Sequence, residues 1–161
     1  MLEENYNHLD IEDKIYNFWE SNKLFEPKKN NKKEYFSIVI PPPNVTGNLH
    51  MGHALNNSIQ DLLVRFYRLK GYETLWQPGT DHAGIATELI VEKKLNEKNQ
   101  SKNTLGREKF LKEVWNWKEH SGNLIINQLK KLGSSCDWSQ TRFTMDKNMS
   151  EAVVKVFLEL H

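Results

Sequence analysis

Cysteine is nearly missing from this sequence of 161 residues, in which Cys136 is the single example. A disulfide framework is therefore excluded, and a reducing compartment is expected. Long hydrophobic runs are missing too, because none approaches the roughly 18 residues that a membrane-spanning helix needs. The opening residues, MLEENYNHLD, lack the apolar core of a signal peptide. We therefore expect a cytoplasmic protein without a membrane partner.

An excess of one charge is also missing, since Lys and Arg number 22 and Asp and Glu number 21. This balance neither requires nor excludes a nucleic-acid partner, which a strongly basic domain would indicate directly. The basic connector EPKKNNKKEY suits either a solvated loop or contact with phosphate or RNA. The hydrophobic content of 38% is ordinary for a globular domain with its own core.

Hydrophobic periodicity predicts alternating helices and strands. The expected elements cover residues 10–22, 35–40, 51–70, 73–77, 84–98 and 104–132, followed by a last helix with Met149, Val153, Phe157 and Leu160 on one face. The strands at 35–40 and 73–77 flank a helix, which indicates a βαβ unit with a parallel sheet. Gly122 weakens the middle of the long helix, so a break is expected there. The sequence therefore predicts an α/β fold.

Apolar side chains are expected to lie together on one face of each helix. In the helix at 51–70 they form one stripe, consisting of Leu55, Ile59, Leu62, Leu63, Phe66 and Leu69. In the first helix the corresponding face holds Ile11, Ile15, Phe18 and Trp19. The tryptophans Trp115, Trp117 and Trp138 suit core anchors better than base-stacking platforms, and Cys136 suits an inert buried thiol.

The most informative segment is PPPNVTGNLHMGHA, residues 41–54. It consists of a rigid proline entry, a glycine turn and the first turn of a helix, placed after a predicted parallel strand. Ligands of α/β proteins bind at the carboxyl ends of the parallel strands, and a helix N-terminus at that edge favours the binding of phosphate. His50 and His53 lie on one face of the first turn and can donate hydrogen bonds to phosphate oxygens. Two alternatives are a metal site, which lacks a third ligand nearby, and a pair of ordinary surface histidines.

This segment resembles the HIGH signature of the class I aminoacyl-tRNA synthetases, and its longer form PPPNVTGNLHMGHA is similar to the valyl-tRNA synthetase family. Two further strings in the same order, QPGTDHAGIATE at 77–88 and CDWSQTRFTMD at 136–146, resemble that family as well. Cys136 departs from the family pattern. The isoleucine family of the same class and small adenylyltransferases with an HxGH signature remain alternatives, although neither is expected to carry GTDHAG.

The resemblance implies roles for individual residues. His50 and His53 are the implied catalytic residues, which bind the ATP phosphates and stabilise the transition state. The implied ATP-binding set also includes Gly52, beneath the adenine, and Thr46, whose contact with the γ-phosphate is left open. The implied valine-binding residues are Pro41, Pro42, Pro43 and Asn44, which form a wall, and Asp81, which holds the substrate ammonium. Asp81 could instead turn its own loop, and His82 could either line the site or pack beside it.

The resemblance also implies the overall organisation. Residues 1–34 are expected to form an N-terminal helix and linker, and residues 35–161 part of a Rossmann-like, doubly wound catalytic domain that ends before the editing insertion. The N-terminal and C-terminal stretches are expected to be helical. The implied reaction is the ATP-dependent activation of valine and its transfer to tRNA(Val). Magnesium is expected to accompany ATP, without a dedicated metal site in this chain.

The second signature of class I synthetases, KMSKS, does not occur in this sequence. The helical pattern also continues to the last residues, FLELH, without a stop signal. We therefore expect a fragment of a longer protein that is monomeric at full length. By itself the fragment is expected to bind ATP or nothing, and to catalyse nothing.

Overall fold

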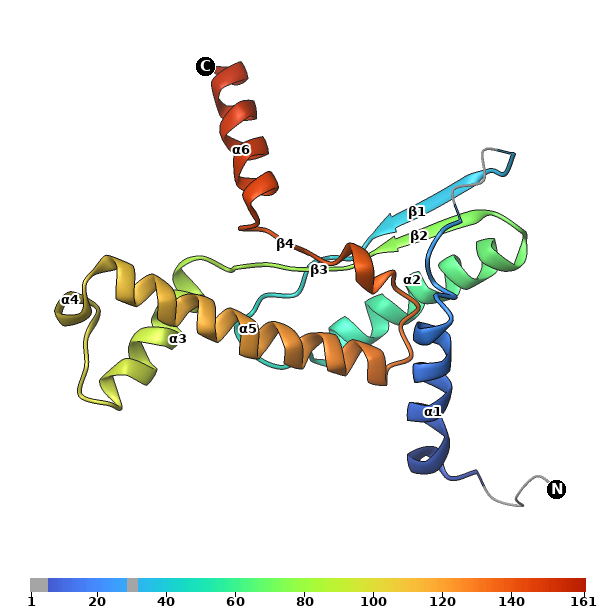
Figure 1. Cartoon of the computed structure of the whole chain (residues 1–161), viewed down its shortest axis with the longest axis horizontal. Helices are drawn as coiled ribbons and strands as arrows, with labels where there is room; N and C mark the ends of the chain where they lie inside the picture. The colour runs from blue at the N-terminus through green and yellow to red at the C-terminus, as the bar shows by residue number, and fades with distance from the viewer. Residues whose placement is uncertain (1–5, 29–31) are drawn as a thin grey trace.

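A computed structural model describes residues 6–28 and 32–161 (Figure 1). Residues 29–31 of the basic connector lie outside the described residues, as do residues 1–5. The elements in chain order are α1 (His8–Ser21), β1 (Tyr35–Val39), α2 (Met51–Leu69), β2 (Glu73–Gln77), β3 (Gly79–Thr80), α3 (Ile85–Asn96), α4 (Lys102–Leu105), α5 (Arg107–Lys131), the 3-10 helix η1 (Trp138–Gln140), β4 (Arg142–Phe143) and α6 (Lys147–Leu160).

The predicted βαβ unit is confirmed. Strands β1 and β2 are parallel neighbours, in a register that runs from Tyr35 opposite Glu73 to Val39 opposite Gln77, and α2 connects them. The ladder continues for one bond, from the Ile40 amide to the Gln77 carbonyl oxygen at 2.9 Å, and then reaches the prolines, which have no amide hydrogen to donate. The short strands β3 and β4 form a second parallel pair further along the chain. The α/β fold expected from the sequence is therefore present.

Among the described residues, two clusters of buried side chains can be distinguished in the core. The larger one lies between the β1–β2 sheet, α2, α5 and the segment after α5, and contains Ile40, Val45, Val64, Trp76, Ile125, Leu129, Cys136 and Phe143. The smaller one packs α3 against α5 through Val91, Leu95 and Phe110. The helix α5 contributes to both clusters and runs along the length of the molecule (Figure 1). It therefore ties the two halves of the chain together.

The apolar stripe predicted on α2 does not face the core. All six of its members are exposed, from 42% at Leu63 to 89% at Leu69, and the buried residues of α2 are Asn57 and Val64. The apolar run at 35–40 indicates a buried strand, but Tyr35 and Val39 of β1 are 60% and 71% exposed. Periodicity shows that a helix has an apolar face but not which neighbour covers it. In the described part of the chain nothing covers that face of α2.

The apolar face predicted on the first helix is buried only in part, with Ile11 and Trp19 half-buried. Tyr16 is buried, whereas Ile15 and Phe18 are 42% and 61% exposed. The ring of Tyr16 contacts Trp19 and Phe25 edge-on or tilted, with centroids 5.9 Å away in both cases. A tyrosine is favoured at this position because its hydroxyl also finds buried hydrogen-bond partners.

The expected break at Gly122 is also absent. The helical stretch is interrupted instead at Gly106, whose φ of 75° lies in the left-handed region that favours glycine, and α5 then continues through Gly122. Gly122 is a helical residue with no neighbouring atom within 4 Å of the position of a Cβ. Its low helix propensity, about 1 kcal/mol relative to alanine, is offset by the packing of Ile125 and Leu129 in the same helix.

The tryptophans meet the expectation only in part. Trp117 and Trp138 are partly buried against the two core clusters, but Trp115 is 41% exposed and is not a core anchor.

Cys136 is fully buried, and this burial raises the pKa of its thiol far above the ordinary value. The thiol is therefore protonated and shielded, as expected for an inert structural cysteine.

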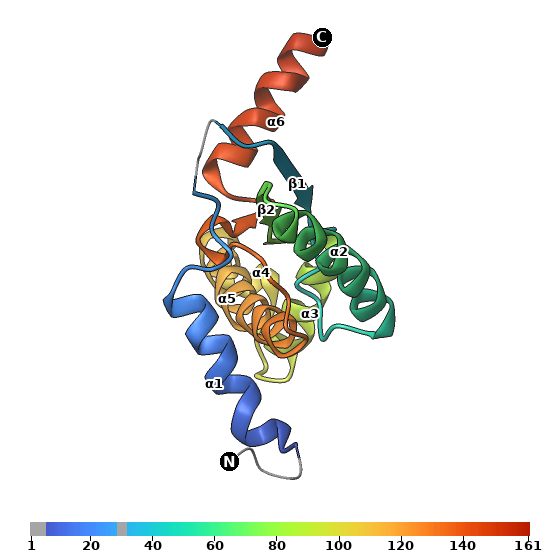
Figure 2. The ribbon, with the colours of Figure 1, turned by 90° about the vertical axis from the view of Figure 1, so that its right-hand side faces the viewer.

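The last helix, α6, projects away from the rest of the chain in two perpendicular views (Figure 1, Figure 2). All of its large hydrophobic side chains are exposed, including Val153 at 66% and Phe157 at 68%. Within the described residues, no helix is long and apolar enough to cross a membrane.

Candidate functional site

The predicted site begins where β1 and β2 end. The chain after β1 runs beside the chain after β2, because the Asp81 amide donates to the Pro43 carbonyl oxygen at 2.8 Å and the Val45 amide donates to the Asp81 carbonyl oxygen at 2.9 Å. These bonds form an isolated parallel bridge between Asn44 and Asp81. The structure therefore brings together the 41–54 segment and the 77–88 string, which are separate in the sequence.

The two signature histidines form the start of α2. His50 is the N-cap residue, and its Nδ1 accepts a hydrogen bond from the Gly52 amide at 3.1 Å. The Nδ1 atom of His53 accepts in turn from the His50 amide at 3.2 Å, which completes a reciprocal capping box. The two ring centroids are 3.9 Å apart. Neither histidine lies in the middle of a helix, in agreement with the prediction.

This capping arrangement determines which ring nitrogen carries hydrogen. Because Nδ1 accepts a hydrogen bond in both rings, the neutral imidazoles of His50 and His53 carry their hydrogen on Nε2. Burial, and secondarily the neighbouring His50, lowers the pKa of His53 below its ordinary value. His53 is therefore a neutral hydrogen-bond donor at neutral pH, beside the positive end of the α2 dipole.

Gly52 has a local reason to lack a side chain. A Cβ at this position would lie 3.0 Å from Cε1 and 3.1 Å from Nδ1 of His50. The glycine thus allows the His50 ring to fold back over the first turn of α2 and cap it. This role is compatible with the approach of a flat ligand, which the resemblance implies for the same residue.

The opposite wall of the His50 region is provided by α5. The Leu49 amide donates to Oε1 of Gln128 at 2.9 Å, so that the entry to α2 is attached to α5. An open, largely apolar cavity of about 650 Å³ lies here, lined by Leu49, His50, Met51, Ala54, Asn127, Gln128, Lys131 and Leu132. The structure places His50 in this cavity and Asp81 in a separate loop, after β3. Gln128 was not expected from the sequence, since a helical Gln carries no distinctive signal.

Asp81 makes the turn contact that was considered as its alternative role. Its Oδ1 accepts a hydrogen bond from the Ala83 amide at 2.5 Å. The other carboxylate oxygen, Oδ2, has no hydrogen bond within the part of the chain that the structure describes, and the side chain is 33% exposed. Turning the loop and binding a cation are therefore compatible functions of one carboxylate.

His82 packs beside the loop that carries Asp81 and lines a small cavity, and its role in the site stays a prediction. It packs edge-on against Phe143 with ring centroids 6.4 Å apart, and its Nδ1 lies 2.6 Å from Oγ1 of Thr144. It also lines a cavity of about 260 Å³ together with Val45, Trp115 and Phe143. Thr144 was missed by the sequence reasoning, although it lies inside the FTMD string that the resemblance identified.

Two further expectations concern Thr46 and metal ions. Thr46 is half-buried in the turn before α2, and it makes no hydrogen bond through its hydroxyl within the described residues.

No group of three or more His, Cys, Asp or Glu side chains in residues 6–28 and 32–161 could hold a metal ion. A metal site made by His50 and His53 would therefore lack a third ligand from these residues.

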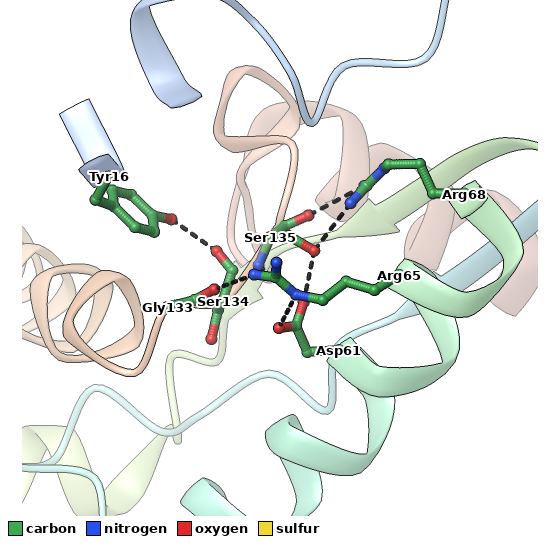
Figure 3. A network of polar contacts seen from close by, with 7 residues as sticks. All are labelled: Tyr16, Asp61, Arg65, Arg68, Gly133, Ser134 and Ser135. Carbon is green, nitrogen blue, oxygen red and sulfur yellow. Dashed lines mark hydrogen bonds and ion pairs between the residues drawn. The ribbon is translucent and has the colours of Figure 1, made fainter. Parts of the chain in front are cut away.

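A polar network fixes α2 against the turn that follows α5 (Figure 3). Asp61 is its centre, since Oδ1 accepts from the Ser135 amide at 3.0 Å and Oδ2 accepts from Nε of Arg65 at 2.7 Å. Arg65 also donates to the Gly133 carbonyl oxygen at 2.8 Å, and Arg68 donates to Oγ of Ser135 at 3.1 Å. These contacts set the orientation of the helix whose first turn holds the two histidines.

The helix α1 joins the same turn through Tyr16 (Figure 3). The Tyr16 hydroxyl donates to the Ser134 carbonyl oxygen and accepts from Nε1 of Trp138, both at 2.7 Å.

The substitution Tyr16→Phe would leave both partners without this hydroxyl, at a cost of about 1–2 kcal/mol in local stability. We expect amide hydrogen exchange at residues 134–138 of the intact protein to become roughly 5- to 30-fold faster.

Tyr67→Phe is the matched control, because Tyr67 stacks on Phe36 at 3.9 Å and its hydroxyl has no hydrogen bond within the described residues. Equal exchange rates in Tyr16→Phe and wild type would show that the hydroxyl does not hold α1 to the turn.

Known proteins were compared with this chain. The family described as tRNA synthetases class I (I, L, M and V) matches residues 14–161. Over its whole length the chain is similar to the valine–tRNA ligases of Pelagibacter ubique, at 66% identity, and Bradyrhizobium diazoefficiens, at 57% identity. It spans 18% and 17% of the lengths of these two relatives.

A solved structure shows the same fold. It is that of LeuRS from Agrobacterium radiobacter in a ternary complex with tRNA and LeuAMS, with a TM-score of 0.77 at 20% identity over 97% of this chain and 18% of that one. At this identity the likeness concerns the fold alone, and it agrees with the Rossmann-like architecture expected from the sequence. The family match over residues 14–161 shows that this chain belongs to the class I tRNA synthetases of the I, L, M and V group.

Proposed function

We propose that this chain supplies part of the ATP-binding and valine-binding site of a valine–tRNA ligase. The observation that carries this proposal is the whole-chain similarity to enzymes with that name, at 66% identity for the Pelagibacter ubique relative. We call this chain within a polypeptide of the relatives' full length the complete synthetase. In it, residues 35–161 are proposed to form the first part of the catalytic domain, after an N-terminal helix and linker at 1–34.

The proposed reaction has two steps. A carboxylate oxygen of valine attacks the α-phosphorus of ATP, the bond to the bridging oxygen breaks, and pyrophosphate leaves. A ribose hydroxyl at the end of tRNA(Val) then attacks the carbonyl carbon of valyl-adenylate, and AMP leaves. The first step needs little covalent help from a protein, because positioning and charge stabilisation account for most of the acceleration of phosphoryl-type transfer.

His50 and His53 are proposed to stabilise the charge that develops on the phosphate oxygens. Their Nδ1 atoms are occupied by the capping box, which leaves two Nε2–H donors at the start of α2. Such preorganised donors do not need to reorient during the reaction, which is why they lower the barrier more than water would. Thr46 and Gly52 are proposed to line the nucleotide side of the same turn. Magnesium would arrive with the ATP phosphates as part of the substrate.

Asp81 is proposed to hold the valine ammonium through the oxygen that the Ala83 amide does not use. A carboxylate and an ammonium form a charge-assisted hydrogen bond, stronger than a neutral one. Pro41, Pro42, Pro43 and Asn44 are proposed as the wall between valine and nucleotide. The bridge between Asn44 and Asp81 supports this grouping, because it attaches the wall directly to the ammonium site.

The proposal is tested by amino-acid-dependent exchange of pyrophosphate into ATP. We expect the complete synthetase to catalyse this exchange with valine, and much more weakly with isoleucine, which has one more methylene group. The methylene difference is worth roughly 10- to 200-fold. The isolated chain is expected to catalyse none. A complete synthetase that prefers isoleucine would support the alternative family and contradict the assignment of valine.

A further inference from the structure

We propose that Thr144 is a positioning residue for amino-acid binding, which acts through His82 to hold the Asp81 carboxylate in place; this inference rests on the proposed function of Asp81. The two segments involved are the loop 79–84 and the strand end at 142–146. They are far apart in the sequence but pair as the parallel strands β3 and β4.

One hydroxyl group restrains both the backbone and the ring of His82. Oγ1 of Thr144 accepts a hydrogen bond from the His82 amide at 2.9 Å and lies 2.6 Å from Nδ1 of the same residue. A hydroxyl can accept the amide hydrogen and donate its own hydrogen to the ring nitrogen at the same time. His82 directly follows Asp81 and directly precedes Ala83, so that restraining it restrains the peptide groups on both sides.

The loop needs such a restraint because its backbone conformation at Ala83 is energetically unfavourable. Ala83 has a φ of 54° and Gly84 a φ of 49°, so that two successive residues lie outside the usual negative range. A residue with a Cβ rarely adopts this conformation, and it persists only when the surroundings enforce it. The Ala83 amide is also the donor to Oδ1 of Asp81 at 2.5 Å. The orientation of the carboxylate is therefore coupled to the unfavourable turn.

The second tie on this loop comes from α3. Oγ1 of Thr87, which is buried, donates to the His82 carbonyl oxygen at 2.6 Å. Consequently both the amide and the carbonyl group of His82 are bound by threonine hydroxyls from different segments. Of these two threonines only Thr144 also contacts the His82 ring, and for this reason it is the better candidate for orienting the loop.

The segment that carries Thr144 is itself firmly held. The Thr144 amide donates to the Thr80 carbonyl oxygen at 3.2 Å, and the adjacent Phe143 is a buried member of the larger core cluster. The two strands approach so closely that a Cβ on Gly79 would lie 2.8 Å from the carbonyl oxygen of Arg142. The burial of Phe143 in the core anchors this segment independently of the 79–84 loop, so that the Thr144 hydroxyl can position the loop.

The first test uses two substitutions at Thr144 in the complete synthetase. Thr144→Val keeps the branched shape but removes the hydroxyl, and Thr144→Ser keeps the hydroxyl. We expect Thr144→Val to raise the KM for valine roughly tenfold, as the loss of one or two hydrogen bonds would. The KM for ATP should stay within about twofold, and Thr144→Ser should restore the wild-type KM for valine within a similar factor.

Thr141→Val is the matched control. Thr141 lies in the same segment. Its hydroxyl donates one hydrogen bond, to the Trp138 carbonyl oxygen at 2.7 Å, and has none to the 79–84 loop among the described residues. An equal loss in Thr141→Val and Thr144→Val, or equal increases in the KM values for valine and ATP, would overturn the inference in favour of a general structural effect.

A double-mutant cycle with Asp81→Asn separates the inference from the function on which it rests. If Thr144 acts through Asp81, adding Thr144→Val to Asp81→Asn should change the KM for valine less than twofold, whereas independent effects multiply. Multiplying effects overturn the inference. An unchanged KM in Asp81→Asn alone overturns the proposed function of Asp81. A clear loss in Asp81→Asn together with a silent Thr144→Val overturns only the role of Thr144.

A pair of substitutions at His82 covers the case in which Thr144→Val does not fold. His82→Asn keeps a polar atom close to the position of Nδ1, and His82→Phe keeps a ring against Phe143 but removes that atom. We expect a higher KM for valine in His82→Phe than in His82→Asn. The reverse order would show that ring packing, and not the contact with Thr144, positions the loop.

Discussion

Each of the substitutions His50→Ala and His53→Ala is expected to slow the formation of valyl-adenylate by roughly 10²- to 10³-fold. This is the usual effect of removing one preorganised donor from a charge-stabilising site. Valine affinity should change much less, because the charge on the phosphate develops mainly in the transition state. The measurement is the rate of pyrophosphate exchange by the complete synthetase at saturating valine and ATP, together with the two KM values.

The capping box complicates this experiment and also provides its control. His50→Ala removes the N-cap acceptor for the Gly52 amide, which by itself costs about 1 kcal/mol of helix stability. Asparagine is a favoured N-cap residue, so His50→Asn should retain the cap while it removes the Nε2 donor. We therefore expect His50→Asn to be as slow as His50→Ala but more stable. His120→Ala, at an exposed histidine of α5, serves as the neutral reference.

Two outcomes would contradict the proposed role of the histidines. The first is a normal rate at saturation with weaker valine binding, since it would indicate a role in the ground state. The second is full recovery of the rate in His50→Asn, because capping of α2 would then be the sole contribution of His50.

Asp81→Asn is expected to weaken valine binding roughly 10- to 150-fold, since each 1.4 kcal/mol of binding free energy corresponds to a tenfold change in affinity. The substitution preserves the shape of the side chain but removes its charge, and a hydrogen bond to a charged group is commonly worth ~1.5–3 kcal/mol. ATP affinity should change much less, because the carboxylate is proposed to face the amino acid. Calorimetric titration of the complete synthetase with valine and with ATP separately measures both effects.

The structure makes this substitution an unusually clean test. The Oδ1 atom of Asp81 accepts from the Ala83 amide, and the carbonyl oxygen of an asparagine can accept the same bond. If loop turning is the whole role of Asp81, Asp81→Asn should be nearly silent. Asp137→Asn is the matched control, since Oδ1 of the buried Asp137 accepts from the Ser139 amide at 3.1 Å in the same local pattern. Near-normal valine binding in Asp81→Asn would exclude the ammonium role.

Much of the candidate site could be predicted from local sequence. The prolines at 41–43 end the first strand, and the glycine turn and histidines that follow mark the start of a helix. Successive parallel strands end at the same edge of a sheet, so the proximity of the 41–54 segment and the loop after the second strand follows from the predicted βαβ unit. The bridge between Asn44 and Asp81 shows that approach.

Other parts of the site could not be predicted, because they depend on contacts between distant segments. Gln128 and Ser135 carry no pattern in their own neighbourhoods that distinguishes them from surface polar residues, and nothing within the 136–146 string singles out Thr144. Each acquires its role from a partner on another element: Leu49 for Gln128, His82 for Thr144, and Asp61 for Ser135. The capping box could have been suspected from the spacing of His50 and His53, but the tautomer that it imposes required the hydrogen-bond geometry.

The sequence by itself determined the order and type of the main helices and strands, the parallel βαβ unit and the helix-terminal placement of His50 and His53. These features follow from local preferences of the backbone and from periodicity, which act over a few residues. Only the tertiary structure decided which faces are buried. It turned Val64 inward in α2 and left the stripe from Leu55 to Leu69 exposed, and it moved the helix break from Gly122 to Gly106. Burial depends on which surfaces meet, and the spacing of apolar residues along one segment does not specify its neighbour.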